Sequence, residues 1–241
     1  MEKNLQRENV EKEFIEFCEK NRIKINSQKL ENLYRYYELL NEWNEKINLT
    51  AITKLEDVYV KHFEDSLLGV ALIKDNSSLC DIGTGAGFPG LVLAIIKEDI
   101  KVTLVDALQK RVKFLNLIVS ELNLPNVTVL HNRAEDVDFK NSYLNSFDYV
   151  VARAVARLNV LTEYCLPYVK VGGQFIAYKS EKTEEEILEC KNAFNVLGGE
   201  LKEVINLQLK DMVRNLVVII KNKSTNISYP RGQNKPKLKP L

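Results

Sequence analysis

Histidine, cysteine and long apolar runs are scarce in this chain of 241 residues, and each scarcity excludes a class of protein. The four cysteines lie far apart and form no C-x-x-C pair, and the only histidines are His62 and His131. No metal site is therefore expected. No apolar run approaches the roughly 18 residues that span a bilayer, and the N-terminal region lacks the apolar core of a signal peptide. We therefore expect a cytoplasmic protein without a membrane partner.

Acidic residues are missing after Asp211, although the chain as a whole is nearly neutral, with a formal net charge of +1. Seven of the 34 basic residues lie in the last 30 residues, which leaves 27 basic and 33 acidic groups in the other 211. A basic tail on an acidic body is typical of a protein that binds a polyanion. A solvated, disordered end would carry the same charges, and charge alone does not choose between these two interpretations.

Glycine is also uncommon, and three of the 10 glycines alternate within the run LCDIGTGAGFPG: Gly83, Gly85 and Gly87. The apolar residues before them are typical of a buried parallel strand, and the apolar segment after them is typical of a helix. Glycine lets the backbone turn tightly and approach a ligand closely. Asp106 closes the next apolar stretch, VTLVD, where a carboxylate can accept hydrogen bonds from ribose hydroxyls. This unit predicts a binding site for an adenosine-containing cofactor.

The glycines alone leave the identity of the cofactor open. Counted from Gly83 the pattern is G-x-G-x-G, which suits S-adenosylmethionine. Counted from Gly85 it is G-x-G-x-x-G and ends at Gly90, which suits a dinucleotide. A tight strand-to-helix turn without a ligand is the third interpretation.

Residues 1–77 are predicted to be helical, because apolar side chains recur there at helical spacing. We expect the second helix to begin after Ser27 as its N-cap. We expect a third helix from Thr53, where the sequence TKLE has the form of a capping box. The stretch between these two helices mixes polar and apolar residues and is typical of an ordered loop.

From residue 78 to about 222 the pattern alternates strand with helix, which predicts a doubly wound α/β sheet with right-handed crossovers. The last two strands have no helix between them and should form an antiparallel hairpin at one edge. Seven strands ending in such a hairpin are typical of methyltransferases, whereas a dinucleotide domain more often has six parallel strands. The candidate strands are 79–82, 102–106, 127–130, 147–151, 173–178, 201–208 and 215–220, and the candidate helices are 90–97, 108–122, 157–169 and 182–197. Residues 223–241 are predicted to be an extended basic tail.

Several segments together resemble one family. DIGTGAGFPG, VDALQKR, VVARAVARL and YPRGQNKPKLKPL are similar to the glucose-inhibited division protein B family, the bacterial 16S ribosomal RNA guanine-N7 methyltransferases. WNEKINLTAI and HFEDSL match as well, so the resemblance covers roughly residues 43–241. Ala107 stands where the family often has serine, and Asn234 where its tail often has glycine. The resemblance implies a Rossmann-like class I fold and methyl transfer from S-adenosyl-L-methionine to the N7 of a guanine in 16S rRNA of the small ribosomal subunit. A monomer is expected.

The resemblance also implies roles for particular residues. Phe88 and Arg153 are expected to contact a ligand, although Phe88 could instead be a packing residue and Arg153 could pair with Asp148 or Glu135. Asp81 is expected to receive the ammonium of the cofactor, or else to cap the turn. The expected cofactor-binding residues are Asp81, Gly83, Gly85, Gly87, Phe88, Asp106, Ala107, Leu108, Ala134, Glu135 and Arg153. The expected RNA-binding residues are Arg157, Lys179, Arg214, Arg231, Lys235, Lys237 and Lys239.

No catalytic acid or base is predicted. Guanine N7 carries an in-plane lone pair and no proton, so alignment of the reacting atoms is expected to dominate catalysis. His62 and Asp65 share one helical face, where they either contribute to the substrate cleft or form a buried polar pair. Replacing either residue singly is expected to reduce the rate modestly. Three alternative functions stay open from the sequence. They are an NAD(P)-dependent oxidoreductase, a non-catalytic RNA-binding module with a vestigial cofactor pocket, and a methyltransferase that acts on a small molecule or protein, against which the basic tail argues weakly.

Overall fold

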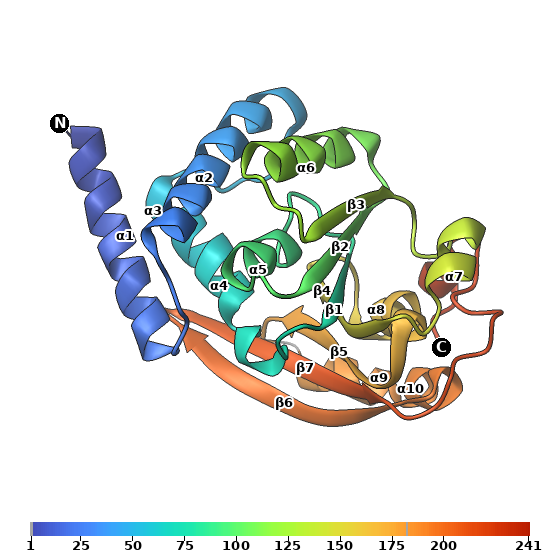
Figure 1. Cartoon of the computed structure of the whole chain (residues 1–241). Coiled ribbons are helices and arrows are strands. Elements are labelled where there is room, and N and C mark those ends of the chain that lie inside the picture. The colour runs from blue at the N-terminus through green and yellow to red at the C-terminus, as the bar shows by residue number, and fades with distance from the viewer. Residues whose placement is uncertain (1, 182) are drawn as a thin grey trace.

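A seven-stranded mixed sheet forms the centre of the computed structural model, which describes residues 2–181 and 183–241 (Figure 1). The strands lie in the order β3-β2-β1-β4-β5-β7-β6, and β7 runs antiparallel to both β5 and β6. The predicted sheet and its edge hairpin are therefore confirmed. The strands in chain order are β1 (Ser78–Ile82), β2 (Lys101–Asp106), β3 (Val127–His131), β4 (Phe147–Arg153), β5 (Val169–Lys179), β6 (Gly199–Leu209) and β7 (Met212–Lys221).

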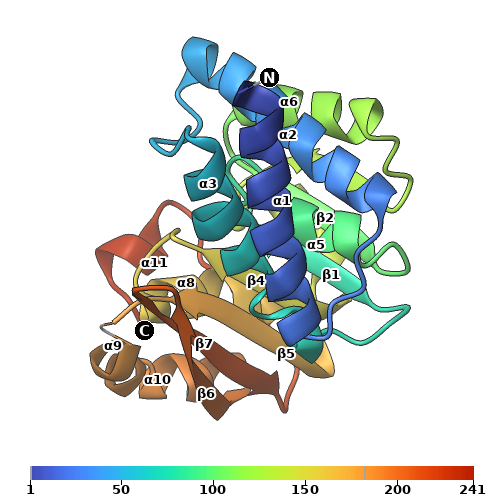
Figure 2. The ribbon, with the colours of Figure 1, turned by 90° about the vertical axis from the view of Figure 1, so that its left-hand side faces the viewer.

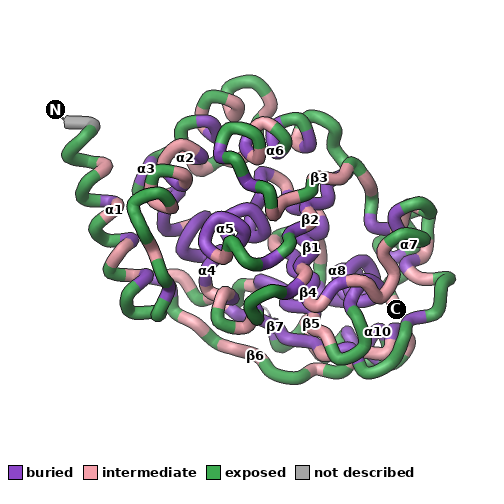
Figure 3. The backbone as a smooth tube through the Cα atoms, in the orientation of Figure 1, coloured by how far each residue is buried: buried purple, intermediate pink, exposed green. Residues whose placement is uncertain are grey.

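Both faces of the sheet are covered by helices. Successive side chains along a strand point to opposite faces, so each strand contributes to two buried clusters. In β4, Tyr149 and Val151 join one buried cluster and Val150 and Ala152 join the other. The first cluster lies under α5 (Gly90–Ile96), α6 (Gln109–Glu121) and the N-terminal helices, and the second under α8 (Leu158–Cys165) and α10 (Lys191–Leu197). Buried residues accordingly gather along the central strands and along α5 and α8 (Figure 3).

The helices of the sheet region follow the sequence pattern with three differences. The predicted helix 157–169 ends as an α-helix at Cys165 and continues as a 3-10 turn at Leu166–Tyr168, where Pro167 removes a backbone donor. The predicted helix 182–197 is divided into α9 (Thr183–Glu189) and α10. The helix α7 (Val137–Tyr143) was not predicted, since its short sequence has little apolar periodicity.

The N-terminal region is helical, as the spacing of its apolar residues predicts. It consists of α1 (Glu2–Lys20), α2 (Ser27–Ile47), α3 (Leu55–Val58), a π-helical segment (Tyr59–Glu64), α4 (Asp65–Leu67) and a 3-10 turn (Val70–Leu72). Tyr36 of α2 is completely buried and donates a hydrogen bond to the carbonyl of Ala86 at 2.5 Å. The N-terminal helices thus share one buried cluster with α5 and the first face of the sheet.

Both predicted N-caps of these helices were wrong. The N-cap of α2 is Asn26, whose side chain accepts a hydrogen bond from the backbone N–H of Lys29 at 2.8 Å. Asparagine and serine cap helices equally well, so adjacent Asn26 and Ser27 could not be separated by residue type. The third helix begins at Leu55 rather than Thr53, and no side chain caps it. The capping box predicted from the residues TKLE is therefore not formed.

The sequence predicted an extended C-terminal tail, and this prediction was wrong. The tail folds back onto the sheet region. It contains the short helix α11 (Lys235–Leu238), which lies against α8 (Figure 2). Tyr229 and Leu241 pack on the second buried cluster, and Pro236 is buried. These apolar residues are too widely spaced to produce a periodic pattern, which explains why the sequence did not predict the folded tail.

None of the helices in residues 2–181 and 183–241 is long and apolar enough to cross a membrane.

Candidate functional site

The turn between β1 and α5 lies at the carboxyl edge of the sheet and has the backbone that the glycines predicted. Gly83, Gly85 and Gly87 have φ angles of +72°, +64° and +107°, a region that disfavours side chains. A Cβ atom on Gly87 would lie 2.6 Å from the hydroxyl of Tyr36, whereas one on Gly85 would meet no atom within 4 Å. Gly85 therefore borders open space, into which a ligand could approach the backbone.

Asp81 lies at the end of β1 beneath this turn and is completely buried. Its Oδ2 accepts hydrogen bonds from the hydroxyl of Thr84 at 2.7 Å and from the backbone N–H of Gly90 at 2.8 Å. Its Oδ1 is buried and has no hydrogen-bond partner among the residues that the structure describes. Burial raises the pKa of this carboxyl to about 6. One oxygen thus caps the turn, which is one of the two predicted roles, and the predicted contact with the ammonium of the cofactor stays a prediction.

Asp106 connects the ends of β1 and β2. Its Oδ2 accepts a hydrogen bond from the backbone N–H of Gly85 at 2.9 Å, and its Oδ1 accepts one from the backbone N–H of Leu108 at 2.9 Å. Arg111 contacts the same carboxylate at 3.4 Å, a pairing that the sequence analysis did not propose. The carboxylate is only 3% exposed and belongs to the framework of the turn.

Five of the predicted cofactor residues come together around a cavity of about 120 Å³ next to Asp106, which we call the turn cavity. They are Gly83, Asp106, Ala107, Ala134 and Glu135. Leu108 lies outside this cavity and is 43% exposed. The other lining residues were not predicted for the cofactor: Ile82, Val105, Asn132, Arg133, Val155, Tyr164, Asn234 and Lys237. Asn234 and Lys237 belong to the tail, whose folded position the sequence did not reveal.

Phe88 is placed as a packing residue. Its ring is 6% exposed and stacks between the ring of His62, at 4.4 Å between centroids, and that of Tyr36, at 5.4 Å. The guanidinium of Arg153 lies over the ring, 5.1 Å from its centroid. Phe88 thus lies between the glycine turn and the π-helical segment Tyr59–Glu64, and it fixes the position of His62.

Arg153 does form an ion pair, but with neither of the partners that the sequence suggested. Its guanidinium contacts Oδ2 of Asp65 at 2.5 Å, and Arg214 contacts Oδ1 of the same carboxylate at 2.5 Å. Asp148 instead pairs with Lys170, and Glu135 lies 3.9 Å from Arg133. Arg153 is the last residue of β4, and Arg214 lies in β7. Only β5 lies between these two strands, so the sheet brings the two arginines to the same edge.

These groups line a second cavity of about 370 Å³, which we call the arginine cavity. Lys61, His62, Tyr178, Lys179 and Glu186 complete its charged and aromatic lining, together with Asp65, Arg153 and Arg214. Burial, and then the charge of Arg153, lowers the pKa of His62 to about 4. Ala154 lines the arginine cavity and Val155 lines the turn cavity, so the two cavities lie on either side of the chain that follows β4.

The residues predicted to bind RNA do not form one surface. Arg231 pairs with the buried Glu163 at 2.6 Å, Arg157 with Glu189 at 2.7 Å, and Lys179 with Glu186 at 2.6 Å. Arg214 and Lys179 line the arginine cavity, and Lys237 lines the turn cavity. Lys235 and Lys239 are exposed on the tail.

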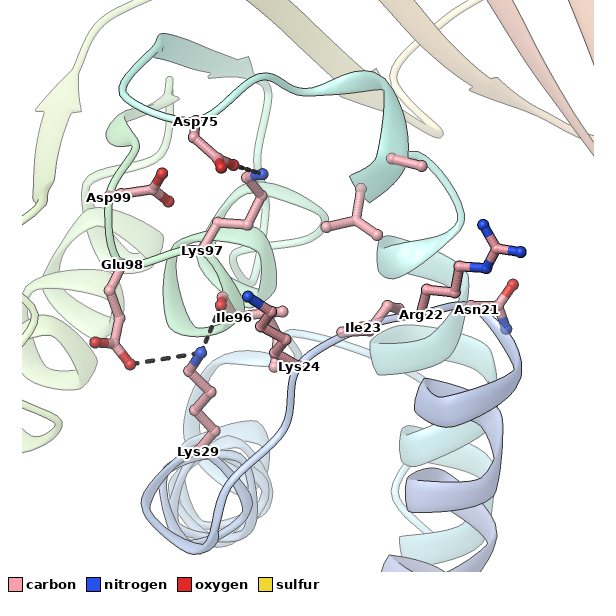
Figure 4. Close-up of a pocket in the computed structure, with 12 residues that line it drawn as sticks. Asn21, Arg22, Ile23, Lys24, Lys29, Asp75, Ile96, Lys97, Glu98 and Asp99 are labelled. Carbon is pink, nitrogen blue, oxygen red and sulfur yellow. Dashed lines mark hydrogen bonds and ion pairs between the residues drawn. The ribbon is translucent and has the colours of Figure 1, made fainter.

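A larger cavity, of about 550 Å³, lies elsewhere, near the starts of β1 and β2 (Figure 4). Charges of both signs line it, and several already pair with one another: Lys29 lies 3.7 Å from Glu98, and Lys97 pairs with Asp75. Ligands of doubly wound sheets bind at the carboxyl ends of the strands, which is the opposite edge. The turn cavity and the arginine cavity are therefore the candidate site.

Comparisons with known proteins agree with this assignment. The family model described as "GidB: rRNA small subunit methyltransferase G" matches residues 29–217. The ribosomal RNA small subunit methyltransferase G of Bacillus cereus (strain B4264) is 48% identical over 238 residues, covering 97% of this chain and 99% of that protein. The protein of the same name from Staphylococcus epidermidis (strain RP62A) is 48% identical over 223 residues, covering 91% and 93%.

Solved structures share the fold at low sequence identity. The crystal structure of M. jannaschii TYW2 in complex with AdoMet has a TM-score of 0.54 and 18% identity, and the match covers 66% of this chain and 74% of that one. A SAM-dependent methyltransferase from Aquifex aeolicus has a TM-score of 0.52 and 19% identity, with coverage of 68% and 93%. The predicted Rossmann-like fold is thereby confirmed. The family model and the curated relatives set aside the oxidoreductase and non-catalytic alternatives. The chain belongs to the GidB family, rRNA small subunit methyltransferase G, and is an S-adenosylmethionine-dependent rRNA methyltransferase.

Proposed function

We propose that this rRNA methyltransferase binds the adenosine part of S-adenosylmethionine in the turn cavity and admits the target guanine from the arginine cavity. The reaction is methyl transfer to the N7 of a guanine in 16S rRNA of the small subunit. The observation that carries the proposed placement is Asp106, whose carboxylate holds the N–H of Gly85 at 2.9 Å and borders a cavity with Ala107 and Ala134. An acid at this strand end is suited to ribose hydroxyls.

The residues around the turn fit such a ligand. The open space beside Gly85 gives room for the ligand to approach the backbone. The unpaired Oδ1 of Asp81 is an acceptor that the ammonium of the methionine part would satisfy, and a buried acceptor without a partner is costly. Ala134 and Glu135, after β3, are proposed to border adenine.

S-adenosylmethionine supplies, when bound, a methyl group on a sulfonium ion. The task of the protein is then to hold guanine N7 in line with that methyl group, with the reacting atoms about 3–3.5 Å apart. The charged lining of the arginine cavity includes Lys61, Arg153, Lys179 and Arg214, which suit a phosphate of the RNA near the target base. His62 lines this cavity and stacks on Phe88, which restricts the imidazole and with it the positions that the base can take.

We propose the cytoplasm as the compartment, and the state of the thiols supports this proposal. Cys18, Cys80, Cys165 and Cys190 are all free and buried, and none forms a disulfide. Unpaired cysteines suit a reducing compartment, and a 16S rRNA substrate is found there as well. These observations support the cytoplasm as the place of action.

The function can be tested on 16S rRNA from cells that lack this protein. We expect one guanine to lose its N7 methyl group, detected by mass spectrometry of nuclease fragments, and to regain it when the purified protein and S-adenosylmethionine are added to small subunits. An unchanged methylation pattern in those cells would contradict the proposed function.

Single-turnover methyl transfer is expected to be independent of pH between pH 7 and 9. The imidazole of His62 has a pKa of about 4 and is therefore neutral throughout this range, so its ionisation cannot govern the rate. His62→Gln keeps a polar side chain and should lower the rate constant modestly, by about 10-fold or less, with the same flat pH profile. A rate that rises with pH in the parent protein and vanishes in His62→Gln would instead show that His62 acts as a base.

Removing the tail lysines is expected to weaken the salt dependence of RNA binding. Lys235, Lys237 and Lys239 are exposed, whereas Arg231 already pairs with Glu163. Replacing the three lysines by alanine should reduce the slope of log K against log salt by about 2, which fluorescence anisotropy with a 16S rRNA fragment can measure. The control variant replaces three other exposed lysines by alanine and therefore loses the same charge; they are Lys20, Lys24 and Lys101. Equal slopes for the parent and the tail variant would refute a role of the tail in phosphate contacts.

A further inference from the structure

The C-terminal tail reaches the turn cavity, although the sequence predicted for it only an RNA-binding role. Asn234 and Lys237 line the turn cavity together with Asp106, Ala107 and Glu135. Asn234 has a φ of +56° and is the N-cap of α11, and Lys237 lies one turn further on. The tail therefore contributes polar groups to a cavity whose other lining residues come from the ends of β1 and β2, from the segments that follow β1 to β4, and from α8.

A buried ion pair fixes the position of the tail. The side chain of Glu163 in α8 is completely buried, and Arg231 makes three hydrogen bonds to it: from the backbone N–H and from Nε to Oε1, both at 2.9 Å, and from Nη2 to Oε2 at 2.6 Å. Nη2 also donates to the carbonyl of Lys239 at 2.8 Å. Removing one partner of such a pair is strongly unfavourable because the other charge is left buried, so this contact holds the tail against α8.

We propose that residues 232–238 form the outer wall of the adenosine pocket, and that Asn234 and Lys237 contact the adenosine part of the cofactor. This inference rests on the placement of the cofactor proposed above. Adenine presents ring nitrogens that accept hydrogen bonds and an amino group that donates them. A side-chain amide can do both and an ammonium can donate, so Asn234 and Lys237 match this chemistry. Arg231 and Glu163 act as positioning residues for them.

The competing explanation is that Lys237 serves only as one more charge for RNA phosphates. The two explanations predict different effects when the neighbouring residues Lys235 and Lys237 are each replaced. Lys235 carries the same charge two residues away and is exposed, but it lies outside the turn cavity. A charge effect would be shared by Lys235 and Lys237, whereas a contact with adenosine belongs to Lys237 alone.

Calorimetric titration without RNA separates these explanations. The variants are Lys237→Ala, Lys235→Ala as the charge-matched control, and Asn234→Gly, which keeps the positive φ that glycine tolerates. The ligands are adenosine and S-adenosylhomocysteine, which carry no net charge, so long-range Coulomb effects are small. We expect Lys237→Ala and Asn234→Gly each to bind both ligands about fivefold more weakly, and Lys235→Ala to stay within about twofold of the parent.

The losses should be equal for adenosine and S-adenosylhomocysteine, because the contact is to the part that they share. Affinities of Lys237→Ala and Asn234→Gly equal to that of the parent, or equal losses in Lys235→Ala and Lys237→Ala, would overturn the inference while leaving the proposed function intact. A parent protein that binds neither ligand would overturn the proposed function and this inference with it.

Discussion

Asp106→Ala is expected to lower the affinity for S-adenosylmethionine by about 100-fold or more. The substitution removes the proposed ribose contact, and it also leaves the backbone N–H groups of Gly85 and Leu108 without their acceptor. A hydrogen bond to a charged group contributes about 1.5–3 kcal/mol, and about 2.7 kcal/mol corresponds to a 100-fold change in affinity. Because Gly85 lies on the turn itself, the loss of its acceptor should also loosen the surface that the ligand contacts.

Isothermal titration of the parent and the variant measures this effect directly. Asp138→Ala is a suitable control, since Asp138 is an exposed carboxylate in α7 outside the turn cavity. Its affinity should match that of the parent. A change of less than about threefold in Asp106→Ala would show that the ribose is held elsewhere.

Asp65→Ala is expected to destabilise the fold by about 3 kcal/mol, because breaking a buried ion pair leaves an uncompensated charge. The carboxylate of Asp65 is 4% exposed and contacts both Arg153 and Arg214 at 2.5 Å. Removing it leaves two guanidinium groups facing each other across the arginine cavity. From the sequence alone, replacing Asp65 was expected only to reduce the rate modestly. The structure adds an expected loss of stability, because Asp65 forms two ion pairs.

Urea unfolding at neutral pH measures the cost, and the chain offers a matched control. Asp57, in α3, pairs with Lys61 at 2.7 Å, but both side chains are about two-fifths exposed. Exposed pairs contribute little, so Asp57→Ala should leave the unfolding midpoint unchanged. The double variant Asp65→Ala with Arg214→Met should recover part of the stability, because it removes one uncompensated charge. Equal midpoints for Asp57→Ala and Asp65→Ala would contradict the assigned role of Asp65.

The sheet could be predicted from the sequence because its determinants are local. Short apolar runs, the positions of Gly83, Gly85 and Gly87, and the missing helix before the last strand each specify one element without reference to distant residues. The order of the strands then follows from the rules of doubly wound sheets. Helix boundaries were predicted less well, since Asn26 and Ser27 are equally good N-caps and only the backbone distinguishes them.

The site could be predicted only in part, because only some of its residues are positioned by local features of the sequence. Asp106 and the residues after β3 lie at strand ends, and parallel strands bring their carboxyl ends to one edge. The partners of Arg153 were not predictable, because Asp65 lies 88 residues away in an N-terminal segment whose position depends on packing. The turn-cavity contacts of Asn234 and Lys237 depend on the Arg231–Glu163 pair, which spans 68 residues. Phe88 was expected from the resemblance to contact a ligand, but its ring is placed in a stack with His62 and Tyr36.

The central claim is that the turn after β1 holds the cofactor with its ribose on Asp106. A crystal structure of the full chain with S-adenosylhomocysteine tests this claim most directly. We predict that the adenosine fills the turn cavity, with a ribose hydroxyl within hydrogen-bond distance of Asp106 and the amino group near Oδ1 of Asp81. Density for the ligand in the cavity near the starts of β1 and β2, or anywhere else away from Gly85, would contradict it.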